Sequence, residues 1–355
     1  MKKRIFENTS EEYFFGLKKD GKVAWNAKKH IPYIYIYILM FALGIGLLSG
    51  CGAKKDDVVI YTSLLDYRRE YLTQRLEEEF PQYQIRIEYM PTGSHAAKLL
   101  AEGLDTECDI TTDLEYAYLQ QLDGLGVLAD LSEYDHSIYV PDAGSESNFL
   151  PKERSGGAII LNTKLLEEKG LPTPTCYQDL LKPEYQGLIS MPGPKETGTG
   201  YVFLKSLVNA WGEEAAFDYF DQLTPNILQY TSAGSGPVNA VVQGEAVIGL
   251  GMISPAAREK TDGAPIEITF FEEGSPYALY GQAIIKGKEE KPAVKEVFDF
   301  LIHTYDYEDL EKYAPEKIYA DVDFEMENFP KNVKYADMSN NTLEEKERLL
   351  DLWKY

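Results

Sequence analysis

The sequence predicts an α/β protein built from two lobes. Strand and helix patterns alternate between residues 58 and 122, and the alternation resumes at residue 157 after a turn-rich stretch at 130–155. The 305 residues after position 50 exceed the size at which one hydrophobic core usually keeps growing. Two units, each a mostly parallel sheet covered by helices, are therefore expected.

The first lobe is predicted from three strand–helix pairs. Residues 58–62 are β-branched and aromatic, and apolar residues then recur at helical spacing over 66–80. Residues 84–90 alternate as a second strand, and a short helix at 94–102 is ended by Gly103. A third strand at 108–112 and a third helix at 114–122 complete the run.

The second lobe repeats this organisation. Its predicted strands are 157–161, 188–191, 226–230 and 246–252, and its helices are 163–169, 201–211, 213–223 and 237–243. Thr175 and Gln178 have the spacing of a capping box for a further helix. Strands at 266–271 and 282–285 follow, and the closing helices at 292–303 and 343–353 are expected to return to the first lobe. The predicted boundaries are 58–155 with 270–355 for lobe 1 and 156–269 for lobe 2.

The N-terminal segment has the order of a lipoprotein signal. An eighteen-residue apolar run at 31–48 follows Lys28 and Lys29 and is closed by Ser49, Gly50 and Cys51. Residues 1–50 are therefore predicted to be the signal peptide, Cys51 the lipidated residue, and 51–57 a tether at the outer face of the cell membrane. A transmembrane anchor with a chance cysteine is the alternative interpretation.

Composition excludes several classes of partner. Residues 1–50 hold eight Lys or Arg and four Asp or Glu, so the remainder holds 27 basic and 54 acidic residues, a formal charge of −27. Such a charge repels nucleic acid and anionic lipid surfaces, so contact with the membrane is expected only through the lipid. Cys108 and Cys176 are too few for a disulfide framework and lack metal-site spacing.

Three strand-to-helix junctions concentrate glycine and hydroxyl residues. They are Thr92-Gly93-Ser94, Thr197-Gly198-Thr199-Gly200 and Ser232-Ala233-Gly234-Ser235-Gly236-Pro237. The start of a helix offers unpaired amides and a partial positive charge, and glycine lets an anion approach the backbone. Each junction is a candidate anion site, and ordinary N-capping is the alternative for each. Open α/β sheets bind ligands at these strand ends.

Catalytic signatures are missing from the sequence. No lysine follows the glycines as in a Walker A loop, no GxGxxG follows a strand, and no GxSxG elbow occurs. After residue 50 the only histidines are His95, His136 and His303, and no nucleophile has an evident base. We therefore expect a binding protein rather than an enzyme.

Several short segments occur in a recognisable order over residues 58–303. They are Tyr61-Thr62-Ser63, Asp109-Ile110-Thr111-Thr112-Asp113, Leu188-Ile189-Ser190-Met191-Pro192, Thr197-Gly198-Thr199-Gly200-Tyr201 and Gln243-Gly244-Glu245-Ala246-Val247-Ile248-Gly249. With the signal, this order resembles the type II solute-binding proteins of ABC importers, in the branch of ferric-iron, 2-aminoethylphosphonate, sugar-phosphate and thiamine binders. The resemblance implies a two-lobed periplasmic-binding-protein fold with a cleft between the lobes and a two-segment hinge, near 155–160 and 269–274. It also implies a monomer without cofactor that works with an ABC permease and its ATPase.

The resemblance does not extend to ferric ligands. Ferric binders of this branch carry two adjacent tyrosines where this chain has Ser254 and Pro255. Their histidine and glutamate would fall near Leu65 and Ala96. Typical ferric coordination is therefore not expected.

A small anionic solute, such as a phosphonate or a sugar phosphate, fits the three junctions better. Hydrogen bonds to a charged group contribute about 1.5–3 kcal/mol each, and Arg258 and Lys195 lie near two of the junctions, where either could equally be a surface residue. The predicted ligand-binding residues are Ser63, Thr92, Gly93, Ser94, Thr197, Gly198, Thr199, Ser232, Gly234, Ser235, Gly236, Tyr277 and Arg258. Ferric iron, bound through Tyr277 or Tyr280, is the alternative ligand, and a secreted lipoprotein hydrolase is a remote alternative.

Overall fold

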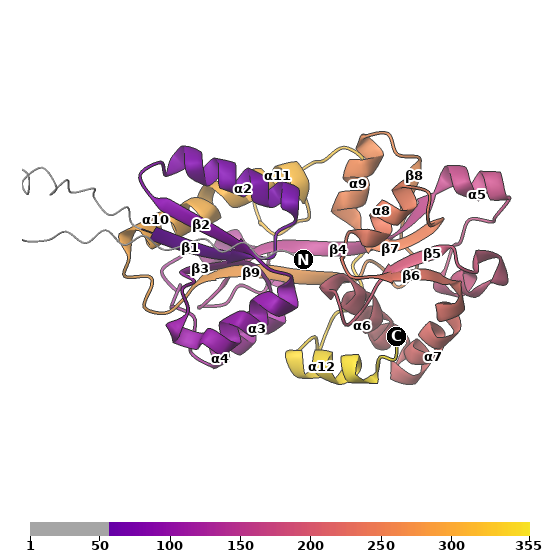
Figure 1. Cartoon of the computed structure of the whole chain (residues 1–355), viewed down its shortest axis with the longest axis horizontal. Helices are drawn as coiled ribbons and strands as arrows, with labels where there is room; N and C mark the ends of the chain where they lie inside the picture. The colour runs from indigo at the N-terminus through magenta and orange to yellow at the C-terminus, as the bar shows by residue number, and fades with distance from the viewer. Residues whose placement is uncertain (1–56) are drawn as a thin grey trace, which may run out of the picture. The chain divides into compact units, whose positions relative to one another are not determined.

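The computed structural model describes residues 57–355, which form two α/β lobes (Figure 1). The predicted signal peptide at 1–50, Cys51 and most of the predicted tether at 51–57 lie outside the described residues. Within residues 57–355 no helix is long and apolar enough to cross a membrane.

The first lobe starts as the sequence predicts. Its first six elements are β1 (Asp57–Thr62), α2 (Asp66–Glu79), β2 (Gln84–Tyr89), α3 (Thr92–Glu102), β3 (Ile110–Glu115) and α4 (Tyr116–Gly124). The central strand β1 pairs in parallel with β2 and β3. The parallel arrangement follows from the right-handed βαβ connections, and helices cover both faces of the sheet (Figure 1).

The second lobe holds the next ten major elements. They are β4 (Leu150–Asn162), α5 (Thr163–Lys169), β5 (Ile189–Pro192), α6 (Gly198–Trp211), α7 (Glu213–Leu223), β6 (Ile227–Thr231), α8 (Gly236–Val242), β7 (Ile248–Met252), α9 (Ile253–Thr261) and β8 (Ile266–Thr269). Strand β5 pairs in parallel with β6 and β7. The helix expected after a capping box is instead a short 3₁₀ turn, Tyr177–Leu181, because the side chain of Asp179 rather than Gln178 bonds Thr175.

Two long strands pass from one lobe to the other. The first half of β4 pairs with β9 (Tyr277–Ile284), and its second half pairs with β7 and β8. Strand β9 also pairs with β3, so the strand order is β2-β1-β3-β9-β4-β7-β5-β6 with β8 beside β4. The second crossing segment therefore begins at Tyr277, later in the chain than the 269–274 predicted, because residues of the predicted strand 282–285 pair as part of a longer strand.

The C-terminal helices divide between the lobes. Helix α10 (Pro292–Phe300), the π-helical turn Leu301–Tyr305 and α11 (Asp306–Tyr313) pack in the first lobe. Helix α12 (Leu343–Leu352) instead contacts α6 and α4, and Trp353 packs edge-on against Phe220 and Tyr230 of the second lobe. The expectation that α12 returns to the first lobe alone was wrong, because amphipathic spacing shows that a helix has an apolar face but not which surface covers it. Apart from this finding, the lobe boundaries stay predictions.

A buried network of charges ties α2 to β4 and α11. Arg68 occupies the buried face of α2, four residues before Leu72, and only 4% of it is exposed. It bonds Asp309 of α11 and pairs with Glu153 of β4. Lys152 of β4 adds bonds of 3.0 Å to Asp306 and 3.1 Å to Asp309. Burial disfavours the Asp309 carboxylate, but Arg68 and Lys152 outweigh that effect and lower its pKa to about 2.

We expect Arg68→Met to lower the free energy of unfolding by about 3–5 kcal/mol, because it leaves the buried Glu153 carboxylate without its cation and removes one of two cations from Asp309. Urea unfolding at pH 7 measures the change. Lys164→Met is the control, since Lys164 pairs with Glu168 in solvent at 3.8 Å and its removal should cost less than about 0.5 kcal/mol. Equal stability of the two variants would contradict the role given to the network.

Candidate functional site

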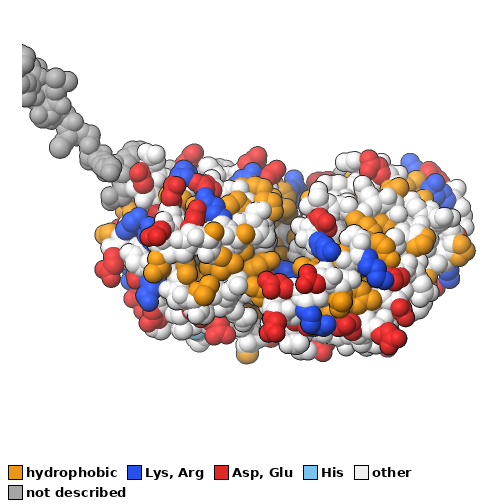
Figure 2. All heavy atoms as spheres, turned by 60° about the horizontal axis from the view of Figure 1, so that its bottom comes forward, with side chains coloured by type: hydrophobic (Ala, Val, Ile, Leu, Met, Phe, Trp, Pro, Cys, Tyr) orange, Lys and Arg blue, Asp and Glu red, His pale blue; other side chains and the backbone are white. Residues whose placement is uncertain are grey.

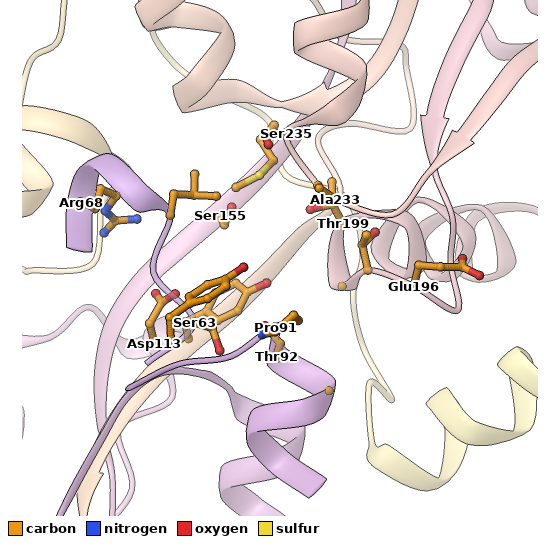
Figure 3. Close-up of a pocket in the computed structure, with 18 of the residues that line it drawn as sticks. Ser63, Arg68, Pro91, Thr92, Asp113, Ser155, Glu196, Thr199, Ala233 and Ser235 are labelled. Carbon is orange, nitrogen blue, oxygen red and sulfur yellow. The ribbon is translucent and has the colours of Figure 1, made fainter. Parts of the chain in front are cut away.

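A cavity of about 170 Å³ is lined by residues of both lobes (Figure 3). Asp113, Ser63 and Thr92 lie across it from Thr199, Ala233 and Ser235 in Figure 3. Figure 2 shows the hollow between the lobes on one face of the molecule. The lining residues are Ser63, Leu65, Arg68, Tyr89, Pro91, Thr92, Gly93, Asp113, Glu153, Ser155, Glu196, Thr197, Gly198, Thr199, Ser232, Ala233, Gly234, Ser235, Met252 and Tyr280. We refer to this cavity as the cleft.

Most of the predicted ligand-binding residues reach the cleft. Those lining it are Ser63, Thr92, Gly93, Thr197, Gly198, Thr199, Ser232, Gly234 and Ser235. Ser94 and Gly236 follow in the first turns of α3 and α8 but do not line it.

The predicted aromatic and basic residues lie elsewhere. Tyr277 packs against Tyr335 and Arg154, away from the cleft lining. Arg258 is exposed in a neighbouring hollow, with its guanidinium 4.4 Å from the centre of the Tyr67 ring. Lys195 donates a 2.8 Å hydrogen bond to the Trp353 carbonyl oxygen and does not line the cleft. The backbone spacing that suggested Arg258 and Lys195 could not show where their long side chains point.

Two helices point their N-termini at the cleft from opposite lobes. Thr92 and Gly93 open α3 in the first lobe, and Gly198 and Thr199 open α6 in the second. Amides in a first helical turn have no carbonyl partner within the helix, and the helix dipole makes this end partly positive. Thr197 caps α6 instead, because its hydroxyl accepts from the Gly200 amide at 2.9 Å and donates to the Gly193 carbonyl at 3.1 Å. Its hydroxyl hydrogen is thus committed to the backbone.

The third junction packs directly against the start of α6. A Cβ atom at Gly234 would lie 2.5 Å from the Thr199 hydroxyl oxygen, so only glycine allows this close approach. Likewise, a Cβ at Gly198 would lie 3.2 Å from the Tyr280 hydroxyl oxygen and 3.3 Å from a Glu115 carboxylate oxygen. The glycines therefore let the two junctions of the second lobe and strand β9 meet at one place.

Ser63 is held by a buried histidine. The Ser63 hydroxyl lies 3.0 Å from Nδ1 of His95, and Nε2 of the same ring lies 2.9 Å from the Thr111 hydroxyl. Burial lowers the pKa of His95 to about 3, so its ring is neutral, with one nitrogen donating and the other accepting. His95 thus supports the cleft from behind rather than lining it.

Several acidic and basic groups in the cleft were missed by the sequence analysis. Arg68 had a signal, since it shares the buried face of α2 with Leu72 and Leu76, but the sequence analysis did not single it out. Asp113 follows the predicted strand 108–112 and ends one of the segments that carry the resemblance, but only the β-bulge between Thr112 and Leu114 shows that it departs from the strand alternation. Burial, followed by the nearby Glu153 carboxylate, raises the pKa of Asp113 to about 7.

Two observations concern metal binding at the cleft. Among residues 57–355 no group of three or more His, Cys, Asp or Glu side chains could hold a metal ion. Tyr280 does line the cleft, but burial and the neighbouring carboxylates raise its pKa well above the ordinary value. Ferric iron would bind this oxygen only by displacing its proton.

Comparison with known proteins identifies the family. Residues 155–341, more than half of the chain, match the bacterial extracellular solute-binding proteins. The chain belongs to this family. Solute-binding proteins of this family bind rather than transform their ligands, act outside the cytoplasm and work with the permease of an ABC importer. The expectations of a type II two-lobed fold and of a non-enzymatic role are thereby confirmed.

Individual relatives are more distant. This solute-binding protein is 29% identical to an uncharacterized Haemophilus influenzae protein over 271 residues, 74% of this chain and 77% of that protein. It is 24% identical to the phosphoglycerate transport regulatory protein PgtC of Salmonella typhimurium, covering 57% of this chain and about half, 51%, of PgtC.

Solved structures share the two-lobed fold. The periplasmic binding protein AfuA of Actinobacillus pleuropneumoniae, solved with fructose-6-phosphate, superposes with a TM-score of 0.74 at 26% identity, over 84% of this chain and 98% of AfuA. Iron-bound HitA of Pseudomonas aeruginosa gives a TM-score of 0.68 at 17% identity over 84% and 98% of the two chains, a likeness of fold alone.

We expect the free energy of unfolding of His95→Gln to fall less between pH 7 and pH 5 than that of the wild type. The folded-state pKa of His95 is about 3 and the unfolded one about 6.5, so between these values the unfolded chain binds the extra proton and stability falls as pH falls. Between pH 7 and 5 the wild type should lose about 2 kcal/mol more than His95→Gln, measured by urea unfolding. Asp113 and Glu316 have pKa values raised to about 7, so the folded chain binds their protons more readily and their contribution to stability rises as pH falls. This contribution is the same in the wild type and in His95→Gln, so it cancels from the comparison.

His303→Gln, at an exposed position, serves as the matched control for this experiment. The same acid loss in His95→Gln and wild type would show that His95 is not held neutral behind Ser63.

Proposed function

We propose that this solute-binding protein captures a small anionic solute of the phosphonate or sugar-phosphate type in the cleft and delivers it to an ABC permease. The observation that carries the proposal is the convergence of α3, α6 and the turn at 232–235 on one cavity. These segments come from both lobes, so one ligand could contact all of them and hold the lobes together.

The chemistry of the convergence favours an oxyanion. Amides of Thr92, Gly93, Gly198 and Thr199 lie in first helical turns, and the hydroxyls of Ser63 and Thr199 belong to residues that line the same cavity. A phosphate monoester carries about −1.5 to −2 charges near neutral pH, and each hydrogen bond to it contributes about 1.5–3 kcal/mol. A few such bonds outweigh the repulsion from distant acidic surface groups, which salt screens over about 8 Å.

Arg68 supplies the positive charge nearest to this site. Its Nε and Nη2 atoms bond Asp309 and pair with Glu153, and Figure 3 shows the guanidinium directed toward the pocket. Its charge is partly neutralised by these carboxylates, so the amides and hydroxyls remain the main source of affinity. Arg258, in the hollow beside the cleft, would act on approach of the ligand rather than in its final position.

The names of two relatives support this ligand class. AfuA was solved with fructose-6-phosphate bound, and PgtC is named for phosphoglycerate transport. Fructose-6-phosphate and phosphoglycerate are both phosphate monoesters, and helix N-termini accommodate the phosphate group.

The anchoring and the closing motion belong to the same proposal. A signal at 1–50, lipid on Cys51 and a tether at 51–57 would keep the receptor near its permease. The strands β4 and β9, which cross between the lobes, would form the hinge about which a lobe at 58–155 with 270–355, apart from α12, closes on one at 156–269. The receptor would act as a monomer, because one chain supplies both walls of the cleft.

Thermal-shift screening with inorganic phosphate, ethylphosphonate and sugar phosphates tests the ligand class. At 100 times its dissociation constant a ligand should stabilise the protein by about 2.7 kcal/mol. Ser235→Glu, which places a carboxylate in the cleft, should abolish the shift because like charges repel. Ser147→Glu, at an exposed position outside the cleft, should leave the shift unchanged.

The proposal would be contradicted if no phosphate or phosphonate raised the melting temperature. It would also be contradicted if Ser235→Glu showed the same thermal shift as the wild type. A visible phenolate-to-iron absorption on addition of ferric iron would instead favour the iron alternative through Tyr280.

A further inference from the structure

The cleft contains a buried carboxyl group that the proposed anion site does not use. Asp113 lines the cleft, only 6% of it is exposed, and its Oδ1 atom has no hydrogen-bond partner among the residues that the structure describes. A buried acceptor left unpaired costs about 1–3 kcal/mol, so such atoms usually have a partner. The cleft is the side from which a partner for Asp113 could come.

The backbone holds Asp113 in an unusual conformation. Its φ angle is 58°, in the left-handed region, and it occupies the bulge where β3 slips in register against β9. Non-glycine residues rarely adopt this region, and strained residues of this kind gather at functional sites. The bulge breaks the alternation of β3 between Thr112 and Leu114 and places Asp113 in the cleft lining.

The charged groups around Asp113 leave it without a cation of its own. Those facing it are Arg68 of α2, Lys152 and Glu153 of β4 and Asp309 of α11. Arg68 donates to Asp309 and pairs with Glu153, and Lys152 donates to Asp306 and Asp309. The two cations Arg68 and Lys152 thus face four carboxyl groups, those of Asp113, Glu153, Asp306 and Asp309. Among the residues that the structure describes, neither cation donates a hydrogen bond to Asp113.

We propose that Asp113 accepts a hydrogen bond from the bound solute and so selects anionic solutes that also carry an ammonium or hydroxyl group. This inference rests on the proposed function, because the anionic group on α3 and α6 would place the other end of a short ligand at Asp113. An ammonium group would also supply the positive charge that the four carboxyl groups lack. Selectivity would thus come from one group on a bulge, while the helix N-termini supply the affinity.

The electrostatic environment of Asp113 agrees with this role. Burial and the Glu153 carboxylate raise the pKa of Asp113 to about 7, so a proton shares the site near neutral pH. A ligand that brings its own donor replaces this proton, whereas a ligand with an alkyl group there leaves the carboxyl unsatisfied.

Three phosphonates with the same two-carbon chain test the inference: 2-aminoethylphosphonate, 2-hydroxyethylphosphonate and ethylphosphonate, which lacks the terminal donor. Calorimetric titration at pH 8 keeps Asp113 mostly ionised. We expect at least one of the two donor-bearing ligands to bind about ten- to hundredfold more tightly than ethylphosphonate, as a hydrogen bond to a charged group implies. The stronger of the two identifies the donor as ammonium or hydroxyl.

Two substitutions assign this preference to Asp113. Asp113→Gly fits φ 58° without strain and should make the three dissociation constants equal within about threefold. Asp113→Asn, which also tolerates this region, should lose the preference for the amine but keep one for the hydroxyl, because its amide oxygen still accepts. Asp105→Asn, on the exposed surface of the same lobe, should match the wild type.

Equal binding of all three ligands to the wild type would overturn this inference and leave the proposed function intact. So would a preference that survives in Asp113→Gly. Binding of none of the three, with no shift by any phosphate, would overturn the proposed function and this inference with it.

Discussion

The buried ion network around Arg68 and Lys152 is the interaction on which the arrangement of the site depends. It joins α2, β4 and α11, elements separated by up to 241 positions in the chain, at the place where β4 leaves the first lobe. Its groups are almost completely buried, so breaking one pair would leave a buried charge without its partner. The network therefore fixes the crossing strand relative to the helix that precedes the cleft, and Arg68 itself lines that cleft.

The crossing strands convert two ordinary α/β units into one binding site. Each lobe ends its parallel strands in polar, glycine-containing junctions, as open sheets commonly do. Strands β4 and β9 turn these ends toward each other, so that α3 and α6 reach one cavity from opposite lobes. Gly234 matters here because a Cβ atom at this position would collide with Thr199 at the start of α6, and a Cβ atom at Gly198 would crowd the side chains of Tyr280 and Glu115.

The cleft combines two kinds of chemistry that a simple anion site would not need. Amides and hydroxyls line one part, while Asp113 and Glu153 bring carboxyl groups to another. In a family whose members bind solutes and do not transform them, such a pairing points to recognition of two ends of a ligand. The neutral His95 behind Ser63 shows that even the donor side is organised by groups that the ligand does not touch.

The sequence by itself determined the fold class, the order of most strands and helices and the three junctions, because hydrophobic periodicity and helix-start chemistry are local. It identified Ser63, Thr92 and Thr199, since each lies just beyond a predicted strand or within a helix-start junction. Only the tertiary structure decided that Arg68 and Asp113 belong to the cleft, that Lys195 does not, and that α12 contacts helices of both lobes. Those outcomes depend on a bulge, on the reach of long side chains and on which surface covers an apolar face, and these are set by contacts between residues far apart in the chain.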